Sequence, residues 1–188
     1  AYYDEFATSC ALDRCLAKAR QMIGWDEKYP CKDIGSNKVR SVGMAIAMQG
    51  SGISGVDVGG ATVKLTDEGR FSLVIGAADM GTGCDTILAQ MVAECMDCTV
   101  DDVTVYSADS DMSPYDSGSY ASSTTYVTGN AVVRACETLK NKICTEGAVM
   151  LGVNKEDVVY ENDEVRCLKD SRKVSLEQIA TASMCGSN

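Results

Sequence analysis

Histidine is absent from this 188-residue sequence, and its absence removes several kinds of chemistry. The chain cannot form a Ser-His-Asp or Cys-His catalytic site, and it offers no histidine as a metal ligand or general base. Positive charge is also scarce, since 17 Lys and Arg stand against 27 Asp and Glu and give a net charge of -10. Nucleic acids and anionic membrane surfaces attract basic proteins, so this composition disfavours both as partners.

A long apolar run and a signal peptide are missing as well. No apolar stretch approaches the roughly 20 residues of a membrane span. Residues 1–6 (AYYDEF) have neither the basic nor the apolar region of an export signal. The ten cysteines are therefore expected to be free thiols in a reducing cytosol, which predicts a cytoplasmic protein. The first residue is not Met, which suggests a fragment or a processed chain.

Cys95 and Cys98 form a single CxxC pair. A structural zinc site needs four ligands, and no second pair or histidine accompanies this one. The remaining cysteines do not have the spacing of an iron–sulfur domain. We therefore interpret the pair as two small buried side chains, with a metal or redox role as the alternative.

The first 36 residues are predicted to form a helix and part of a linker. Apolar residues recur at helical spacing over residues 8–23, where Thr8 or Ser9 is expected to cap the helix and Gly24 to end it. Residues 25–37 are polar and contain Pro30, as is typical of a linker. A separate domain is expected over residues 37–188.

The pattern over residues 37–188 predicts an α+β fold. A helix–turn–strand unit recurs, with a capping-box pattern at each turn (residues 99–102 and 154–157). We expect a two-layer α/β sandwich in which helices pack on one face of a mixed β-sheet. Strands are expected at 40–49, 61–66, 71–76, 103–106 and in a hairpin at 158–168, and helices at 84–96, 124–150 and 175–184. Residues 61–66 alternate as a strand does, and Gly69 is expected to supply the positive φ of the turn that leads into 71–76.

Residues 50–55 (GSGISG) match the dinucleotide-binding pattern G-x-G-x-x-G. That motif binds a pyrophosphate only when a helix follows, because the helix N-terminus supplies the amides. Here the next segment with a clear pattern is another strand, so we reject the dinucleotide interpretation and expect a flexible loop.

Two other loops are predicted to bind an anion. Residues 77–86 (AADMGTGCDT) stand between a strand and a helix, and residues 117–125 (SGSYASSTT) precede the long helix. Helix N-termini present free amides and favour negative charge. For the first loop an ordinary tight connection capped by Asp85 or Thr86 explains the sequence equally well. The second has more hydroxyls than a cap needs, which favours binding. Because each loop follows a strand, both can lie at one edge of the sheet and form a cradle for an extended, anionic ligand.

The stretch from Val42 to Ala135 resembles the molybdenum-cofactor-binding subunit of the xanthine dehydrogenase/aldehyde oxidase family. The resemblance lies in residues 78–86 (ADMGTGCDT), 88–94 (LAQMVAE), 108–111 (ADSD), 113–119 (SPYDSGS) and 121–131 (ASSTTYVTGNA). A weaker tail extends it to Ala182.

The resemblance implies a molybdopterin-binding domain that is a fragment of a larger subunit. It places Met80, Gly81, Thr82 and Gly83 against the pterin dithiolene and the molybdenum, and Ala121, Ser122, Ser123 and Thr124 around the pterin phosphate. The cofactor is then molybdopterin, with a cytosine dinucleotide form as one option. The family hydroxylates purines, aldehydes or N-heterocycles with oxygen from water. Its electrons pass to iron–sulfur and FAD domains or subunits, which are expected as partners with the remainder of the molybdenum subunit.

The chain departs from the family at three points. Thr82 stands where many members carry Gln, and Ser123 stands where many carry Arg. The later Gly-Glu segment that holds the family's catalytic base is not in this sequence, so no catalytic residue and no metal ligand is assigned and the fragment alone is expected to be inactive. Two alternatives remain, namely a stand-alone module that binds a phosphorylated or nucleotide-like ligand, and an interaction domain whose site is lost.

Overall fold

The computed structural model describes residues 9–47 and 55–185. These residues belong to two compact units, Ala1–Gly50 and Ser51–Asn188. The domain boundary predicted between residues 36 and 37 remains a prediction. None of the helices in the described residues is both long and apolar enough to cross a membrane.

The N-terminal unit contains two helices and a short hairpin. Helix α1 (Leu12–Ile23) ends at Gly24, as predicted, because Gly24 adopts a left-handed conformation with φ +67°. Its N-cap is Ala11, so capping by Ser9 was wrong, and Thr8 lies outside the described residues. The predicted linker instead folds into α2 (Trp25–Lys28) and one arm of an antiparallel hairpin, β1 (Lys32–Asp33) with β2 (Val39–Arg40).

The buried strand predicted at residues 40–49 is not found in the described part of that segment. Pairing stops at Arg40, and residues 41–47 are unpaired and mostly exposed, with Ile46 64% exposed. A strand needs a hydrogen-bonding neighbour, and this unit offers residues 41–47 none among its described residues. No residue of 9–47 is buried, so the described part of this unit forms no core.

The C-terminal unit is built on a mixed three-stranded sheet. Strand β3 (Ala61–Leu65) pairs antiparallel with β4 (Phe71–Ile75), and β4 pairs in parallel with β5 (Val103–Ser107). The tight β3–β4 turn uses Gly69 at φ +75°, as the sequence predicts. Residues 50–54 of the glycine-rich motif lie outside the described residues, and the next element is β3 rather than a helix.

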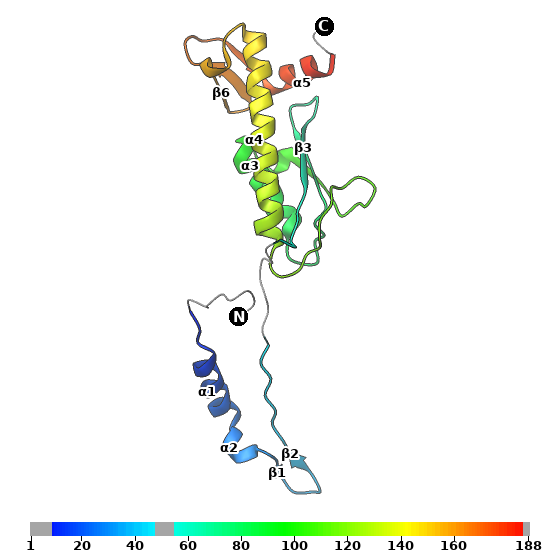
Figure 1. The fold of residues 1–188 in the computed structure, drawn as a ribbon, viewed down its shortest axis with the longest axis vertical. Coiled ribbons are helices and arrows are strands. Elements are labelled where there is room, and N and C mark those ends of the chain that lie inside the picture. The colour runs from blue at the N-terminus through cyan, green and yellow to red at the C-terminus, as the bar shows by residue number, and fades with distance from the viewer. Residues whose placement is uncertain (1–8, 48–54, 186–188) are drawn as a thin grey trace. The chain divides into compact units, whose positions relative to one another are not determined.

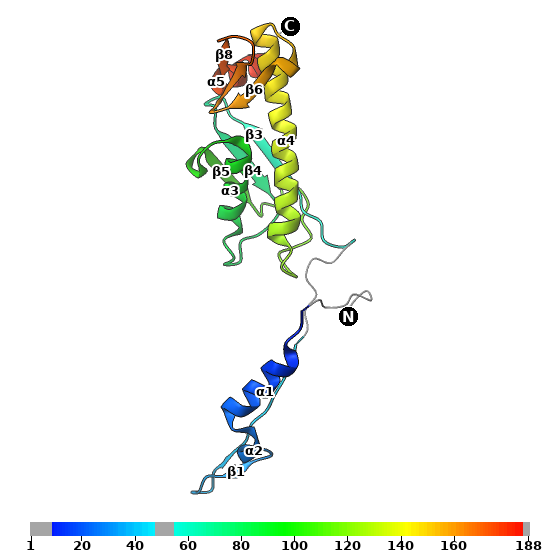
Figure 2. The same cartoon turned by 90° about the vertical axis from the view of Figure 1, so that its left-hand side faces the viewer.

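Two helices cover one face of this sheet. Helix α3 (Cys84–Met96) contacts β5, α4 (Thr124–Leu151) contacts β3, and the helices pack against each other (Figure 1, Figure 2). This arrangement confirms the α+β class, with helices on one side of a mixed sheet. The core joins residues of the sheet and both helices, namely Phe71, Leu73, Ile75, Leu88, Val92, Met96, Val132, Cys136 and Ile143.

A second small sheet lies at the C-terminal end of α4. Strands β6 (Val158–Glu161), β7 (Glu164–Cys167) and β8 (Lys173–Ser175) are antiparallel, and α5 (Leu176–Cys185) follows (Figure 2). The helix–turn–strand unit does recur, through turns η2 (Val100–Asp102) and η3 (Lys155–Asp157), but its two strands join different sheets. The capping box forms at Thr99 only, since Asn154 makes no side-chain cap bond.

Candidate functional site

The two loops singled out in the sequence line one pocket. The β4–α3 loop (residues 76–83) and the β5–α4 loop (residues 108–123) leave adjacent parallel strands, so both lie beyond the carboxyl edge of the sheet. The pocket between them has a volume of about 330 Å³. Among the described residues the lining includes no Lys or Arg, and it consists of Thr82, Cys84, Ser119, Tyr120, Ser122, Thr124 and Thr125.

The β4–α3 loop folds around the carboxylate of Asp79. Its Oδ1 accepts hydrogen bonds from the backbone N–H of Gly81 at 2.8 Å and of Gly83 at 3.1 Å. These bonds hold the pKa of Asp79 below its usual value. Both glycines have positive φ, +101° and +74°, and a Cβ added to either meets no atom within 4 Å. Two amides expected to face a ligand are therefore occupied by Asp79, while the space beside both glycines is open.

The predicted caps of α3 do not form. Gly83 is the N-cap residue, and no side chain makes the cap hydrogen bond. Asp85 instead accepts a hydrogen bond from the Ser107 hydroxyl at the end of β5, at 3.0 Å. Burial raises the pKa of the neighbouring Cys84 thiol. Asp79, Cys84 and Asp85 bring ligand atoms within 4.8 Å of one another, the one such group in the described residues.

The β5–α4 loop reaches α4 through two left-handed residues. Ala121 has φ +51° and Ser122 φ +56°, a region that residues other than glycine seldom adopt and that is often found at functional sites. Ala121 is buried, and the buried Ser123 hydroxyl donates to the Tyr120 carbonyl at 2.8 Å. Within the described residues, the hydroxyls of Ser122 and Thr124 have no hydrogen-bond partner. These two hydroxyls are available to a ligand, whereas Ala121 and Ser123 shape the turn.

The eight predicted site residues therefore divide into three groups. Thr82, Ser122 and Thr124 line the pocket directly. Met80 is 70% exposed and is not among the lining residues. The other four form the backbone of the two loops, namely Gly81, Gly83, Ala121 and Ser123.

Several residues outside the eight predicted site residues hold the two loops together. The Ser119 hydroxyl donates to the Ala78 carbonyl at 2.8 Å, which joins one loop to the other. A hydrogen bond with Asp57 raises the pKa of Tyr120, whose side chain lines the pocket. A Cβ on Gly76 would lie 2.3 Å from the Pro114 carbonyl oxygen, so only glycine permits this close approach. Gly76 directly follows an apolar strand, which is the one local signal that could have identified it.

The CxxC pair lies away from this pocket, at the end of α3. Cys95 and Cys98 are half-buried. Burial raises the pKa of Cys98 to about 11 and that of Cys136, on α4, to about 12. Thiols with such pKa values are protonated and unreactive at neutral pH, which favours the interpretation as packing residues.

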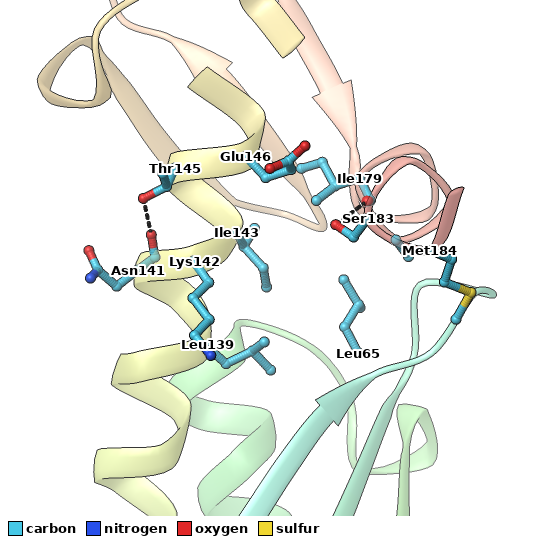
Figure 3. A pocket seen from close by; sticks show the side chains of 11 residues that line it. Leu65, Leu139, Asn141, Lys142, Ile143, Thr145, Glu146, Ile179, Ser183 and Met184 are labelled. Carbon is cyan, nitrogen blue, oxygen red and sulfur yellow. Dashed lines mark hydrogen bonds between the residues drawn. The ribbon is translucent and has the colours of Figure 1, made fainter. Parts of the chain in front are cut away.

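A larger and more apolar groove, of about 530 Å³, lies between α4 and α5. Ile143 of α4, Ile179 of α5 and Leu65 at the end of β3 converge on it, with Lys142 and Glu146 nearby (Figure 3). From Thr124 to Ile143 the helix rises roughly 28 Å at 1.5 Å per residue. The groove is thus far from the two loops, and no helix N-terminus is among its lining residues.

Comparisons with known proteins identify the family of this chain. A family profile described as "Molybdopterin cofactor-binding domain" matches residues 18–187. The probable hypoxanthine oxidase XdhD of Escherichia coli K12 is 42% identical over 155 residues, which are 81% of this chain and 16% of that protein. The putative xanthine dehydrogenase molybdenum-binding subunit XdhA of the same organism is 37% identical over 147 residues, 76% of this chain and 20% of that protein.

A solved structure gives the same result at the level of the fold. Reconstituted CO dehydrogenase from Oligotropha carboxidovorans superposes with a TM-score of 0.62 and 26% sequence identity, over 67% of this chain and 16% of that one. The chain thus spans about a fifth or less of the length of these relatives. Because the family profile covers most of the sequence, the chain belongs to the family of molybdopterin cofactor-binding domains, which occur in molybdenum oxidoreductases of the xanthine dehydrogenase type.

Proposed function

We propose that the pocket between the β4–α3 and β5–α4 loops holds part of the molybdopterin cofactor. The observation that carries this proposal is a pair of hydroxyls at the N-terminus of a 28-residue helix, those of Ser122 and Thr124, which have no hydrogen-bond partner within residues 9–47 and 55–185. Hydroxyls and helix amides bind phosphate without a basic side chain, which suits an acidic protein. The open space beside Gly81 and Gly83 gives a flat group room to approach the backbone.

Each predicted residue has a distinct role in this proposal. Ser122, Thr124 and the turn formed by Ala121 and Ser123 hold the phosphate. Met80, Gly81, Thr82 and Gly83 lie against the pterin dithiolene and the molybdenum. When bound, the cofactor supplies the metal at which a substrate is hydroxylated with oxygen from water. This chain contributes binding and orientation, and we assign it no catalytic residue.

The remainder of the molybdenum subunit completes the site. A volume of about 330 Å³ is at the small end of the range for ligand pockets, so it takes one part of an extended cofactor rather than the whole. Residues 9–47 contain no buried residue and expose Leu12, Val39 and Ile46, which indicates that another polypeptide surface covers them. The relatives are about five to six times longer than the region they share with this chain.

The whole protein is then a cytoplasmic molybdenum hydroxylase that acts on a purine, an aldehyde or an N-heterocycle. The cofactor is molybdopterin or its cytosine dinucleotide, and iron–sulfur and FAD domains or subunits accept the electrons. A linker and helix over residues 1–36 precede the cofactor-binding domain, 37–188. The match to a probable hypoxanthine oxidase and to a xanthine dehydrogenase subunit favours a purine among these substrates.

The proposal is tested by two glycine variants in the native polypeptide, isolated with an antibody raised against this chain. Gly81→Val places a side chain beside the pocket. Gly152→Val is the matched control, because Gly152 also has positive φ (+65°) and open space but lies at the far end of α4. We expect Gly81→Val to lower molybdenum and pterin per polypeptide by about tenfold or more, the effect of losing about 1.4 kcal/mol of binding. Equal cofactor content in both variants contradicts the loop assignment.

The same isolation distinguishes the hydroxylase from the alternative function, a stand-alone binding module. A native polypeptide longer than 188 residues that carries molybdenum supports the hydroxylase. A short polypeptide that lacks molybdenum, and that binds nucleotide phosphates tightly in calorimetry, supports the alternative. We expect weak phosphate binding by the isolated chain, because part of a cradle is poorly preorganised.

A further inference from the structure

The two helix starts that line the pocket differ in charge. At the start of α3, Asp79 accepts hydrogen bonds from Gly81 and Gly83, and Asp85 lies in the first turn. At the start of α4 the first turn has no acidic residue, and the hydroxyls of Ser122 and Thr124 have no partner in the described residues. An Asp side chain thus already occupies the position that an anionic ligand would take at α3, while the start of α4 is open.

We propose that Asp79 is a positioning residue that fixes the β4–α3 loop and directs the anionic part of the ligand to the start of α4. This inference rests on the proposed function and extends it, since it explains why only one of two similar loops takes the phosphate. The carboxylate closes the loop by two hydrogen bonds to one oxygen. The same negative charge repels a second anion at the α3 amides. Thr82 is the residue of this loop that lines the pocket.

Two substitutions separate the two effects of Asp79, its hydrogen bonds to the loop and its negative charge. Asp79→Asn keeps an oxygen that accepts both N–H groups and removes the charge, whereas Asp79→Ala removes both. The N-terminal unit contains a matched control, because Asp33 makes the same bond to the N–H of Gly35, also at 2.8 Å. Asp33→Ala therefore breaks the same kind of Asp–glycine hydrogen bond in a turn that lies outside the pocket-bearing unit.

The first measurement follows the backbone amides of the 188-residue chain by NMR. We expect Asp79→Ala to speed hydrogen exchange at Gly81 and Gly83 by about tenfold, the effect of losing one hydrogen bond. Asp79→Asn should restore the wild-type rate, and Asp33→Ala should leave both glycines unchanged. In the wild type, the shifts of these two amides should titrate with the Asp79 carboxylate. Unchanged exchange in Asp79→Ala overturns the positioning role.

The second measurement titrates inorganic phosphate into the same samples. In the wild type, phosphate should shift the amides of residues 122–125 and leave those of Cys84 and Asp85 in place. Asp79→Asn should allow phosphate to shift both sets. Phosphate shifts at Cys84 and Asp85 in the wild type refute the charge argument. If phosphate shifts neither set in any sample, the proposed phosphate site is wrong, and the exchange data still decide whether Asp79 positions the loop.

Discussion

Two buried glycines of α4 offer a test of how tightly the C-terminal unit is packed. A Cβ on Gly147 would lie 2.7 Å from both Cβ and Cγ1 of Val165, which is fully buried in the middle strand of the second sheet. A Cβ on Gly129 would lie 2.8 Å from Sδ and 3.0 Å from Cε of Met91, the end of a flexible side chain. Val165 is paired on both sides and cannot withdraw, whereas Met91 can change rotamer.

The expected stabilities follow from two opposing contributions. Replacing glycine by alanine within a helix stabilises it by about 1 kcal/mol, and overpacking a rigid core costs about 1–3 kcal/mol. At Gly147 the clash is with anchored atoms, so we expect Gly147→Ala to lower the free energy of unfolding by about 2 kcal/mol, the upper cost less the helix gain. At Gly129 the methionine moves at little cost. Gly129→Ala should therefore leave the free energy of unfolding unchanged or raise it by up to about 1 kcal/mol.

Urea unfolding of the 188-residue chain, followed by circular dichroism, measures both values. Each variant adds one methyl group at a buried glycine of the same helix, so each is a control for the other. Equal m-values would show that the denatured states are comparable. If Gly147→Ala is as stable as Gly129→Ala, the close approach of α4 to Val165 is wrong.

Two further predictions concern ionisable groups. In a thiol-labelling time course at pH 8, Cys98 and Cys136 should react slowly because their pKa values are raised to about 11 and 12, whereas fast labelling should be confined to four exposed cysteines, Cys10, Cys15, Cys31 and Cys185. Rapid labelling of Cys136 in the folded chain would contradict its burial. Burial, and then the nearby carboxylates, raise the pKa of Asp163, so its contribution to stability is present at low pH and is lost as pH rises through the folded pKa. Asp163→Asn should therefore stabilise the chain at pH 7 by about half a kcal/mol or less, given solvent screening, and leave it unchanged near pH 3.

Local signals predicted the elements that the site depends on. Helix α3 was predicted at its observed bounds, 84–96, because a glycine stands immediately before it and its apolar residues recur at helical spacing. The β3–β4 hairpin followed from alternating residues and Gly69. Once the two loops were each placed after a strand, the parallel pairing of β4 and β5 was enough to bring both to one edge.

Interactions between distant residues could not be predicted in this way. The bond from Ser119 to Ala78 joins residues 41 positions apart, and no local pattern marks either partner. The amides of the glycine loop that contains Asp79 were expected to be free. Side-chain acceptors compete for exposed amides, however, and Asp79 lies two residues before Gly81, whose amide it binds. Alternation predicted the hairpin of β6 and β7, but alternation does not specify which sheet a strand joins.

The incorrect prediction for residues 40–49 has a different physical cause. Residues 40–49 are rich in small and β-branched apolar residues, among them Val42, Ala45, Ile46 and Ala47, which is the pattern of a buried strand. Extended backbone becomes a strand only when another edge satisfies its N–H and C=O groups. The described residues of this unit leave residues 41–47 unpaired, with Met44 45% and Ile46 64% exposed. An apolar pattern can therefore mark an extended segment, but it does not supply the neighbouring edge that would make that segment a strand.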